Sequence, residues 1–201
     1  MRRTITFGLV LLCACLAAGC DWIERRAARA GFVQSLGEYE VKGVEFVPEM
    51  PPFGHDWEKA RYLKVELDSS HRLSIGYPTY WIGSASDYCP LKSDFGLVSL
   101  GPIDDRGVQI GRVAGEGSPR KSADGRFHYQ VFVVPAHPMP GLTYNSGWKR
   151  APYDLISDAR DICLQIIGGD HDDVFARSSV IRVSFEQIRK AQQASELGSR
   201  H

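Results

Sequence analysis

The stretch RFHYQVFVV, residues 126–134, constrains the fold of this chain more than any other segment. Apolar residues recur at every second position, as in a β-strand with one buried face: Phe127, Tyr129, Val131 and Val133. Phe132 and Val134 add apolar residues to the opposite face near the end of the run. The sequence therefore predicts a strand whose last residues are buried on both sides.

Weaker versions of this pattern occur along the chain and predict further strands. The clearest runs are 39–47 and 62–67, and shorter ones lie at 98–100 and 108–113. Lys42-Gly43 interrupts the first run, as a β-bulge would. Segments rich in Gly, Pro and Asp separate these runs, which is typical of antiparallel sheets. We expect a mainly β domain, with α+β as the alternative, built as an antiparallel β-sandwich or a barrel-like fold.

The segment YDLISDARDICLQIIGG, residues 153–169, fits two structures. Its apolar spacing fits a helix that Asp154 would cap and Gly168 would end. Alternatively, ICLQII followed by GGDHDD and SSVIRVSF fits two strands joined by a polar turn. We expect a short helix or a turn at 154–160 and a strand at 161–167.

The end of the domain has the pattern of a short helix. Ser184 and Gln187 have the spacing of a capping box, in which each residue binds the other's backbone. Phe185, Ile188 and Ala191 then lie on one helical face. This pattern predicts a C-terminal helix that packs on the sheets.

The start of the chain has the features of a secretory signal. A positive segment, Met1-Arg2-Arg3, precedes an uncharged apolar run from Ile5 to Leu16. This run is shorter than the roughly 20 residues needed to span a bilayer. The next residues, Leu16-Ala17-Ala18-Gly19-Cys20, resemble the lipobox of bacterial lipoproteins, although Ala17 stands where Leu is usual.

This resemblance implies cleavage before Cys20 and attachment of diacylglycerol to its thiol. Each buried CH₂ contributes about 0.8 kcal/mol, so two or more acyl chains hold a protein stably on a membrane. Asp21 resembles the signal that retains enteric lipoproteins in the inner membrane. We expect a lipid-anchored protein of the bacterial cell envelope that faces the periplasm, with the outer membrane as an alternative. Plain secretion, with cleavage after Ala18 or Gly19, is the alternative to acylation.

These features predict one domain with an anchor. The expected parts are a signal peptide at 1–19, a lipidated tether at 20–37, a β-rich domain at 38–195 and a flexible tail at 196–201. A helix and a solvated linker are the alternatives for the tether. Removing 1–19 leaves 22 basic and 24 acidic residues, a net charge of −2. Without a broad basic field, a nucleic-acid partner is not expected.

The cysteines then have different fates. Cys13 and Cys15 leave with the signal, and Cys20 takes lipid. Cys89 and Cys163 remain in an oxidising compartment, where a pair of cysteines favours a disulfide. The functional alternative is a reactive thiol at Cys89, although only Lys92 adds positive charge nearby and no CxxC motif occurs.

Motifs for catalysis are absent from the sequence. It contains no GxSxG, no HExxH and no phosphate-binding glycine loop. We therefore expect a protein that is not an enzyme and needs no cofactor. Asp170, Asp172 and Asp173 are weak candidates for divalent-cation ligands, because carboxylates suit such ions. The Glu and central Gly of a calcium loop are not in place, so a polar hairpin turn is the favoured explanation.

Aromatic residues precede each of the two remaining cysteines. Tyr80 and Trp81 come before Cys89, and Tyr144 and Trp148 come before Cys163; Tyr88 and Tyr153 belong to the same two groups. A disulfide would bring the groups together, and such residues often anchor protein–protein contacts. The alternative is that most of them are core residues of the β domain.

We therefore expect a membrane-anchored binding module whose partner is another envelope or periplasmic protein. An inhibitor or immunity-type lipoprotein is one version of this hypothesis. A structural or assembly component of the envelope is the second class, and a metal-dependent enzyme is the third.

Overall fold

The structure is a computed structural model that describes residues 34–48, 61–74, 81–93, 96–110, 119–137, 151–170 and 173–198. The chain divides into two compact units, Met1–Gln34 and Ser35–His201, and nearly all described residues belong to the second. The predicted signal peptide at 1–19 and the predicted lipidation site Cys20 lie outside the described residues. None of the helices in the described part of the chain is both long and apolar enough to cross a membrane.

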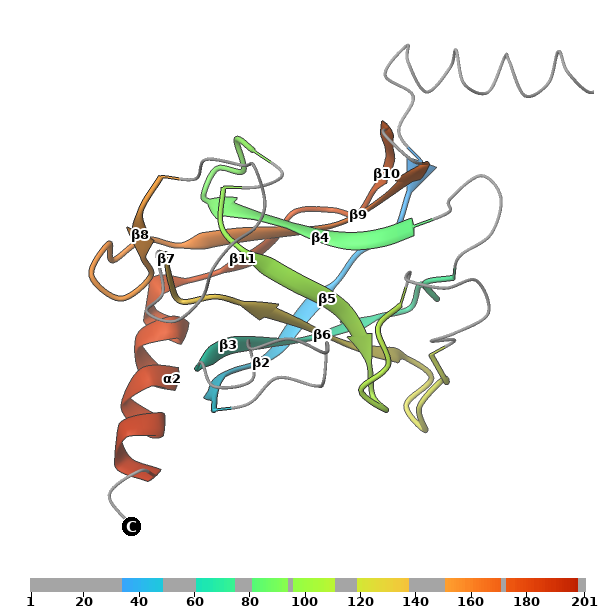
Figure 1. Ribbon diagram of the computed structural model, residues 1–201. Coiled ribbons are helices and arrows are strands. Elements are labelled where there is room, and N and C mark those ends of the chain that lie inside the picture. The colour runs from blue at the N-terminus through green and yellow to red at the C-terminus, as the bar shows by residue number, and fades with distance from the viewer. Residues whose placement is uncertain are drawn as a thin grey trace, which may run out of the picture. The chain divides into compact units, whose positions relative to one another are not determined.

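Three antiparallel sheets make up the second unit (Figure 1). The first sheet contains β1 (Gln34–Ser35), β10 (Asp173–Arg177), β9 (Ile162–Asp170) and β11 (Ile181–Val183), with β4 (Trp81–Tyr88) on the other edge of β9. The second sheet has the order β2 (Glu40–Val47), β3 (Tyr62–Ser69), β6 (Phe127–Val133) and β5 (Ser99–Asp104). A small third sheet pairs β7 (Ala136–His137) with β8 (Tyr153–Asp154).

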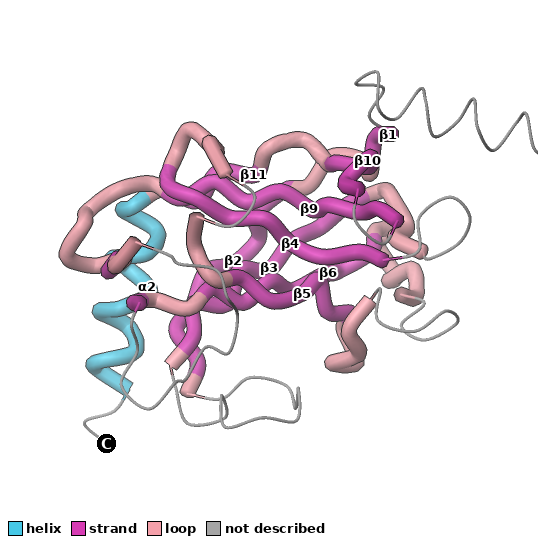
Figure 2. Tube along the Cα trace, turned by 45° about the horizontal axis from the view of Figure 1, so that its top comes forward, coloured by secondary structure: helices cyan, strands magenta, loops and turns pink. Residues whose placement is uncertain are grey.

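The two large sheets pack face to face, as Figure 2 shows, and the main core lies between them. From β3 the core receives Leu63, Val65 and Leu67, and from β9 it receives Ile162, Leu164 and Ile166. Each triplet alternates along its strand, so one face of each sheet turns toward the other. The predicted mainly β, sandwich-like fold with a short C-terminal helix is confirmed.

Strand β6 is buried on both faces, as its sequence predicts. Tyr129 and Val131 face the main core. Phe132 and Val134 belong to a second apolar cluster with Tyr62, and all three are at most 5% exposed. The predicted bulge in β2 is present as well, because the register to β3 shifts between Val41 and Gly43.

The segment at 153–170 forms a turn followed by a strand, so a helix through Ile166 is wrong. The carboxylate of Asp154 accepts hydrogen bonds from the backbone N–H groups of Ile156 (2.9 Å) and Ser157 (3.2 Å), which fixes the turn. Strand β9 then pairs with β4 along its length. Burial between two neighbouring strands and against the opposite sheet outweighs the helical spacing of these residues.

Strands β9 and β10 form a hairpin that the sequence only partly predicts. Asp170 and Asp173 are register partners, so β10 pairs with β9 from its first residue. At the break between β10 and β11, the backbone N–H of Ser178 donates to Ile166 O at 2.9 Å, and Ile166 N–H donates to Ser178 Oγ at 3.0 Å. The Ser178 hydroxyl thus takes the place of a backbone acceptor between the strands, and β11 then pairs with β9.

The prediction of a strand at 108–113 is wrong for residues 108–110, which are the part that the structure describes. Gln109 forms only an isolated bridge with Ile103, and residues 111–118 lie outside the described residues. The buried carboxylate of Asp104 accepts the backbone N–H groups of Arg106 (3.0 Å) and Val108 (2.9 Å). These bonds hold the chain in a turn instead of a second strand.

The C-terminal helix α2 (Phe185–Gly198) begins with the predicted capping box. Ser184 N–H donates to Gln187 Oε1 at 2.9 Å, and Gln187 N–H donates to Ser184 Oγ at 3.2 Å. Ile188 and Ala191 are buried in the main core. For comparison with the predicted domain at 38–195, the first described strand is β1 at Gln34–Ser35 and α2 ends at Gly198.

Replacing Ser184 by Ala is expected to lower the free energy of unfolding by about 1 kcal/mol, because the N–H of Gln187 loses its acceptor. Denaturant unfolding measures this difference. The exposed Ser70→Ala variant is the control, with an expected change within about 0.5 kcal/mol. Equal effects of the two substitutions would contradict a stabilising role for the capping box.

Candidate functional site

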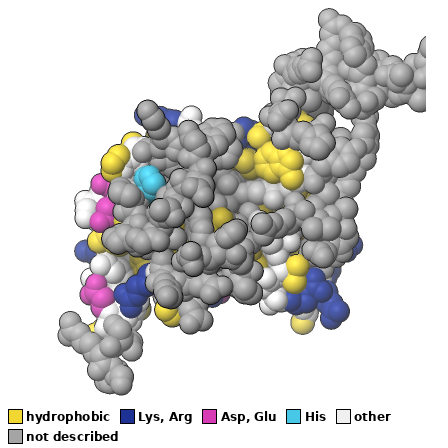
Figure 3. Space-filling view, viewed as in Figure 1, with side chains coloured by type: hydrophobic (Ala, Val, Ile, Leu, Met, Phe, Trp, Pro, Cys, Tyr) yellow, Lys and Arg dark blue, Asp and Glu magenta, His cyan; other side chains and the backbone are white. Residues whose placement is uncertain are grey.

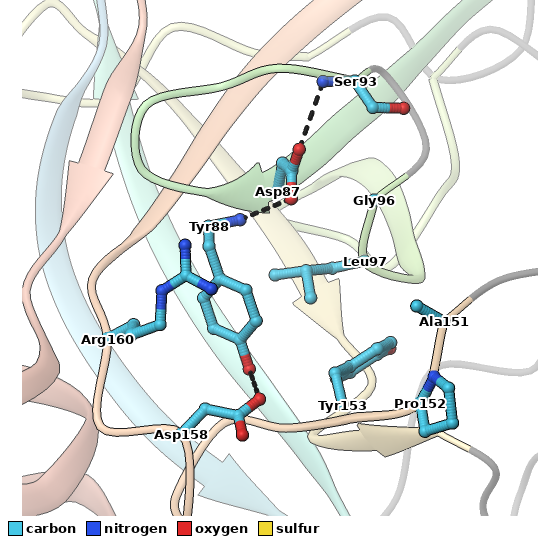
Figure 4. Close-up of a pocket in the computed structure, with 10 residues that line it drawn as sticks. All are labelled: Asp87, Tyr88, Ser93, Gly96, Leu97, Ala151, Pro152, Tyr153, Asp158 and Arg160. Atoms are coloured by element: carbon cyan, nitrogen blue, oxygen red, sulfur yellow. Dashed lines mark hydrogen bonds between the residues drawn. The ribbon is translucent and has the colours of Figure 1, made fainter.

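A pocket of about 590 Å³ lies beside the end of β4, where the disulfide joins it to β9 (Figure 4). It is lined by Asp87, Tyr88, Ser93, Gly96, Leu97, Ala151, Pro152, Tyr153, Asp158 and Arg160. These residues come from β4 and the loop after it, from the start of β8 and from the turn before β9. The pocket therefore forms where three separate parts of the sequence meet.

The disulfide between Cys89 and Cys163 is present, as predicted, with an S–S distance of 2.11 Å. Cys163 is the register partner of Asp87, and Cys89 N–H donates to Asp161 O at 3.0 Å. The bond therefore fastens the chain leaving β4 to the beginning of β9. With both sulfurs bonded, the alternative of a reactive thiol at Cys89 does not hold.

Tyr88 and Tyr153 both line this pocket, so the disulfide brings together one member of each predicted aromatic group. Tyr153 is buried, and its hydroxyl accepts a hydrogen bond from Val98 N–H at 3.0 Å and donates to Val134 O at 3.1 Å. Both tyrosines are at most 9% exposed. They form fixed walls, and the alternative interpretation of these residues as core residues is correct for both.

Tyr88 links the two charged residues of the turn before β9. Its hydroxyl donates to Asp158 Oδ2, and the guanidinium carbon of Arg160 lies 4.2 Å from the centre of its ring. Burial, and then the hydrogen bond to Asp158, raise the pKa of the Tyr88 hydroxyl well above its ordinary value. The same hydrogen bond and one from Asp154 N–H lower the pKa of Asp158. Tyr88 is therefore neutral and Asp158 ionised at neutral pH.

Asp87 holds the loop that follows β4. Its carboxylate accepts the backbone N–H groups of Tyr88 (2.8 Å) and Ser93 (3.1 Å). A Cβ at Gly96 would lie 2.3 Å from Asp87 Oδ1, so only glycine allows the carboxylate this close to the chain. The Asp87 carboxylate therefore holds the loop that lines the pocket in its conformation.

Lowering the pH should remove the contribution of the Tyr88–Asp158 hydrogen bond to stability. Since folding lowers the pKa of Asp158, this contribution is present above the unfolded pKa and is lost as the pH falls through the folded pKa. We expect Asp158→Asn to have a lower Tm than the wild type at pH 7, with the difference disappearing at low pH. Thermal unfolding across pH measures it, with the exposed Glu38→Gln as the control. A Tm difference that is independent of pH would contradict this assignment.

The lining residues offer a ligand apolar contacts and hydrogen bonds. The described lining contains no histidine and no free thiol, and its hydroxyl groups belong to Tyr88, Ser93 and Tyr153.

A second polar cluster lies on the outer face of the second sheet. The buried carboxylate of Asp68 contacts His128 Nδ1 from the neighbouring strand, with Lys42 Nζ at 3.7 Å and Arg126 Nε at 3.9 Å. Glu40 pairs with the same two cations. The charges of this cluster compensate one another, so it is a structural network across β2, β3 and β6.

The other predicted site residues do not join the pocket within the described part of the chain. Cys20, Tyr80, Tyr144, Trp148 and Asp172 lie outside the described residues. Trp81 is half-buried at the start of β4, about 23 Å from Tyr88 along an extended strand. Trp81 therefore lies far from the disulfide, because β4 runs extended from Trp81 to Tyr88.

The candidate cation ligands Asp170 and Asp173 are register partners at the end of the β9–β10 hairpin, and their side chains are not described. This pairing agrees with the polar-turn interpretation. The described side chains contain no group of three or more metal-ligating residues arranged to hold an ion.

Asp158 and Arg160 are among the lining residues that the sequence alone does not indicate. They stand in the short stretch SDARD, which has no motif and reads as an ordinary polar turn. The signal available was their position just before Cys163, on the chain that the disulfide fastens. On the face seen in Figure 3, the described basic and acidic side chains occur in small separate groups, so charge patterning alone would not point to them.

No family model matches this chain, and no curated protein or solved structure matches it.

Proposed function

We propose that this chain is a lipid-anchored binding module that faces the periplasm and engages another envelope or periplasmic protein through the pocket beside its disulfide. The observation that carries the proposal is the pocket of about 590 Å³, whose walls are fixed and whose lining suits binding. The signal-like start and the resemblance of residues 16–20 to a lipobox support the anchor.

The pocket has the features of a pre-organised protein-binding site. Tyr153 is held by two hydrogen bonds, Asp87 by the loop that it caps, and both sides of the pocket by the disulfide. Ordering flexible side chains costs about 0.5–1.5 kcal/mol for each residue on association. Walls that are already ordered avoid much of this cost, and tyrosine and arginine are frequent hot-spot residues.

The anchor is tested by the mass of the mature protein purified from a bacterial membrane fraction. The proposal predicts a chain that begins at Cys20 and carries acyl groups. It also predicts that Cys20→Ser abolishes this acylation. An unmodified Cys20 in the membrane-purified protein would overturn the anchor.

The binding role is tested by blocking the pocket in the full, acylated chain. Ala151 is an exposed lining residue, so Ala151→Trp should fill the opening without disturbing the core. After extraction in mild detergent, native mass measurement should show a one-to-one complex for the wild type and for Ser70→Trp, an exposed control. The complex should be lost for Ala151→Trp with an unchanged Tm. A complex that survives Ala151→Trp would overturn the proposal.

The identity of the partner distinguishes an inhibitor or immunity-type protein from an assembly component. If the module is an inhibitor or immunity-type protein, the partner is an enzyme whose activity falls when the complex forms. If it is an assembly component, the partner is a structural envelope protein and the loss of the module alters the envelope.

A further inference from the structure

Arg160 makes no ion pair at contact distance with the described residues, although its charge acts on Asp158 nearby. Its side chain is exposed, and its guanidinium lies over the ring of Tyr88 without a hydrogen bond or ion pair to the described part of the chain. A guanidinium carries five N–H donors and no acceptor. Arg160 therefore has unused hydrogen-bonding capacity at the pocket.

Two other arginines of the same domain are paired with carboxylates. Arg182, on the neighbouring strand, binds the carboxylate of Asp161, and Arg106 binds that of Asp104 at 2.6 Å. Asp158 is two residues from Arg160, yet the two form no ion pair. Asp158 Oδ2 accepts both the Tyr88 hydroxyl and the N–H of Asp154 instead. Arg160 therefore acts on Asp158 only through its charge, which helps to lower the pKa of that carboxyl, and makes no direct hydrogen bond to it.

The ring of Tyr88 holds Arg160 in place for binding. A guanidinium stacked on an aromatic face keeps its N–H groups available at the edges, and its planar fork matches a carboxylate with two parallel hydrogen bonds. Tyr88 is itself fixed by burial and by Asp158. Figure 4 shows Arg160 and Asp158 approaching Tyr88 from one side of the site, with Leu97, Tyr153 and Pro152 on the other.

We propose that this pocket binds an acidic segment of the partner protein, in which a carboxylate pairs with Arg160 and a neighbouring apolar side chain contacts Leu97 and Tyr153. This inference rests on the proposed function and names the chemistry of its partner. Asp158 Oδ1 accepts no hydrogen bond from the described residues, so it offers an acceptor for a backbone N–H of the same segment.

Three blocked dipeptide amides that differ only in their charge test the proposal: acetyl-Trp-Glu-amide, acetyl-Trp-Gln-amide and acetyl-Trp-Lys-amide. Equilibrium dialysis against the full, detergent-solubilised chain measures the Kd of each, with detergent alone as the blank. We expect the Glu peptide to bind about tenfold more tightly than the other two, because charge-assisted hydrogen bonds are the stronger ones.

Variants of Arg160, and one of a distant arginine, supply the controls. Arg160→Gln should remove the preference for the Glu peptide, and Arg160→Lys should restore part of it. Arg189→Gln, at an exposed position of α2, should leave it unchanged. Tighter binding of the Lys peptide, binding of the Glu peptide that is equal in Arg160→Gln, or no binding of any peptide would each overturn the inference. If the native complex is nevertheless lost in Ala151→Trp, the proposed function stands and only the acidic partner is wrong.

Discussion

Replacing both disulfide cysteines, as in Cys89→Ala with Cys163→Ala, is expected to lower the free energy of unfolding by about 4 kcal/mol. The bond joins residues 74 positions apart, so its loss frees a long loop in the unfolded chain. For a domain of this size, about 4 kcal/mol corresponds to a fall in Tm of roughly 8–16 °C. Thermal and denaturant unfolding measure the change without reductant.

The disulfide also fastens the pocket, so its removal should weaken the native complex as well as the fold. The control is the wild-type chain in a reducing agent, which should unfold at the same Tm as the double variant. A double variant as stable as the oxidised wild type would show that the bond contributes nothing to the domain.

Leu164→Ala should have an effect of similar size, because this side chain lies at the centre of the sandwich. Leu164 is fully buried on β9, between Ser86 of β4 and Ile181 of β11. Removing a buried leucine side chain loses its burial and leaves a cavity, at a cost of about 2–5 kcal/mol. Urea unfolding of the variant measures the loss.

Leu197→Ala is the matched control for this substitution. It makes the same chemical change at a residue that is 66% exposed near the end of α2. Its free energy of unfolding should stay within about 0.5 kcal/mol of that of the wild type. Similar losses in the two variants would argue against a core centred on β9.

The fold could be predicted where one face of a strand is buried, because burial imposes a period of two that the sequence displays directly. The alternation in 62–67 and in 126–134 is of this kind, and β3 and β6 lie there. β4 was harder to predict because Gly83, Ser84 and Ser86 carry no apolar alternation. Its place in the sheet comes from pairing with β9, which is a tertiary effect.

The site could be predicted only as far as the disulfide. The two remaining cysteines indicated which segments meet, and Tyr88 and Tyr153 meet there. The chemistry of the pocket could not be predicted from the sequence, because the ring contact of Arg160 and the hydrogen bond of Asp158 depend on the path of a short polar turn. No spacing rule connects Tyr88 with residues about 70 positions later.

The central claim is that the pocket beside the disulfide contacts a partner protein while the chain is anchored in the envelope. The most direct measurement places a photo-crosslinking amino acid at Pro152, on the exposed lining of the pocket, in cells that make the full acylated chain. The same amino acid at the exposed Ser70 serves as the control. We predict one discrete crosslinked protein from Pro152, none from Ser70, and loss of the Pro152 product in Arg160→Glu. No product from Pro152, or the same product from both positions, would contradict the account.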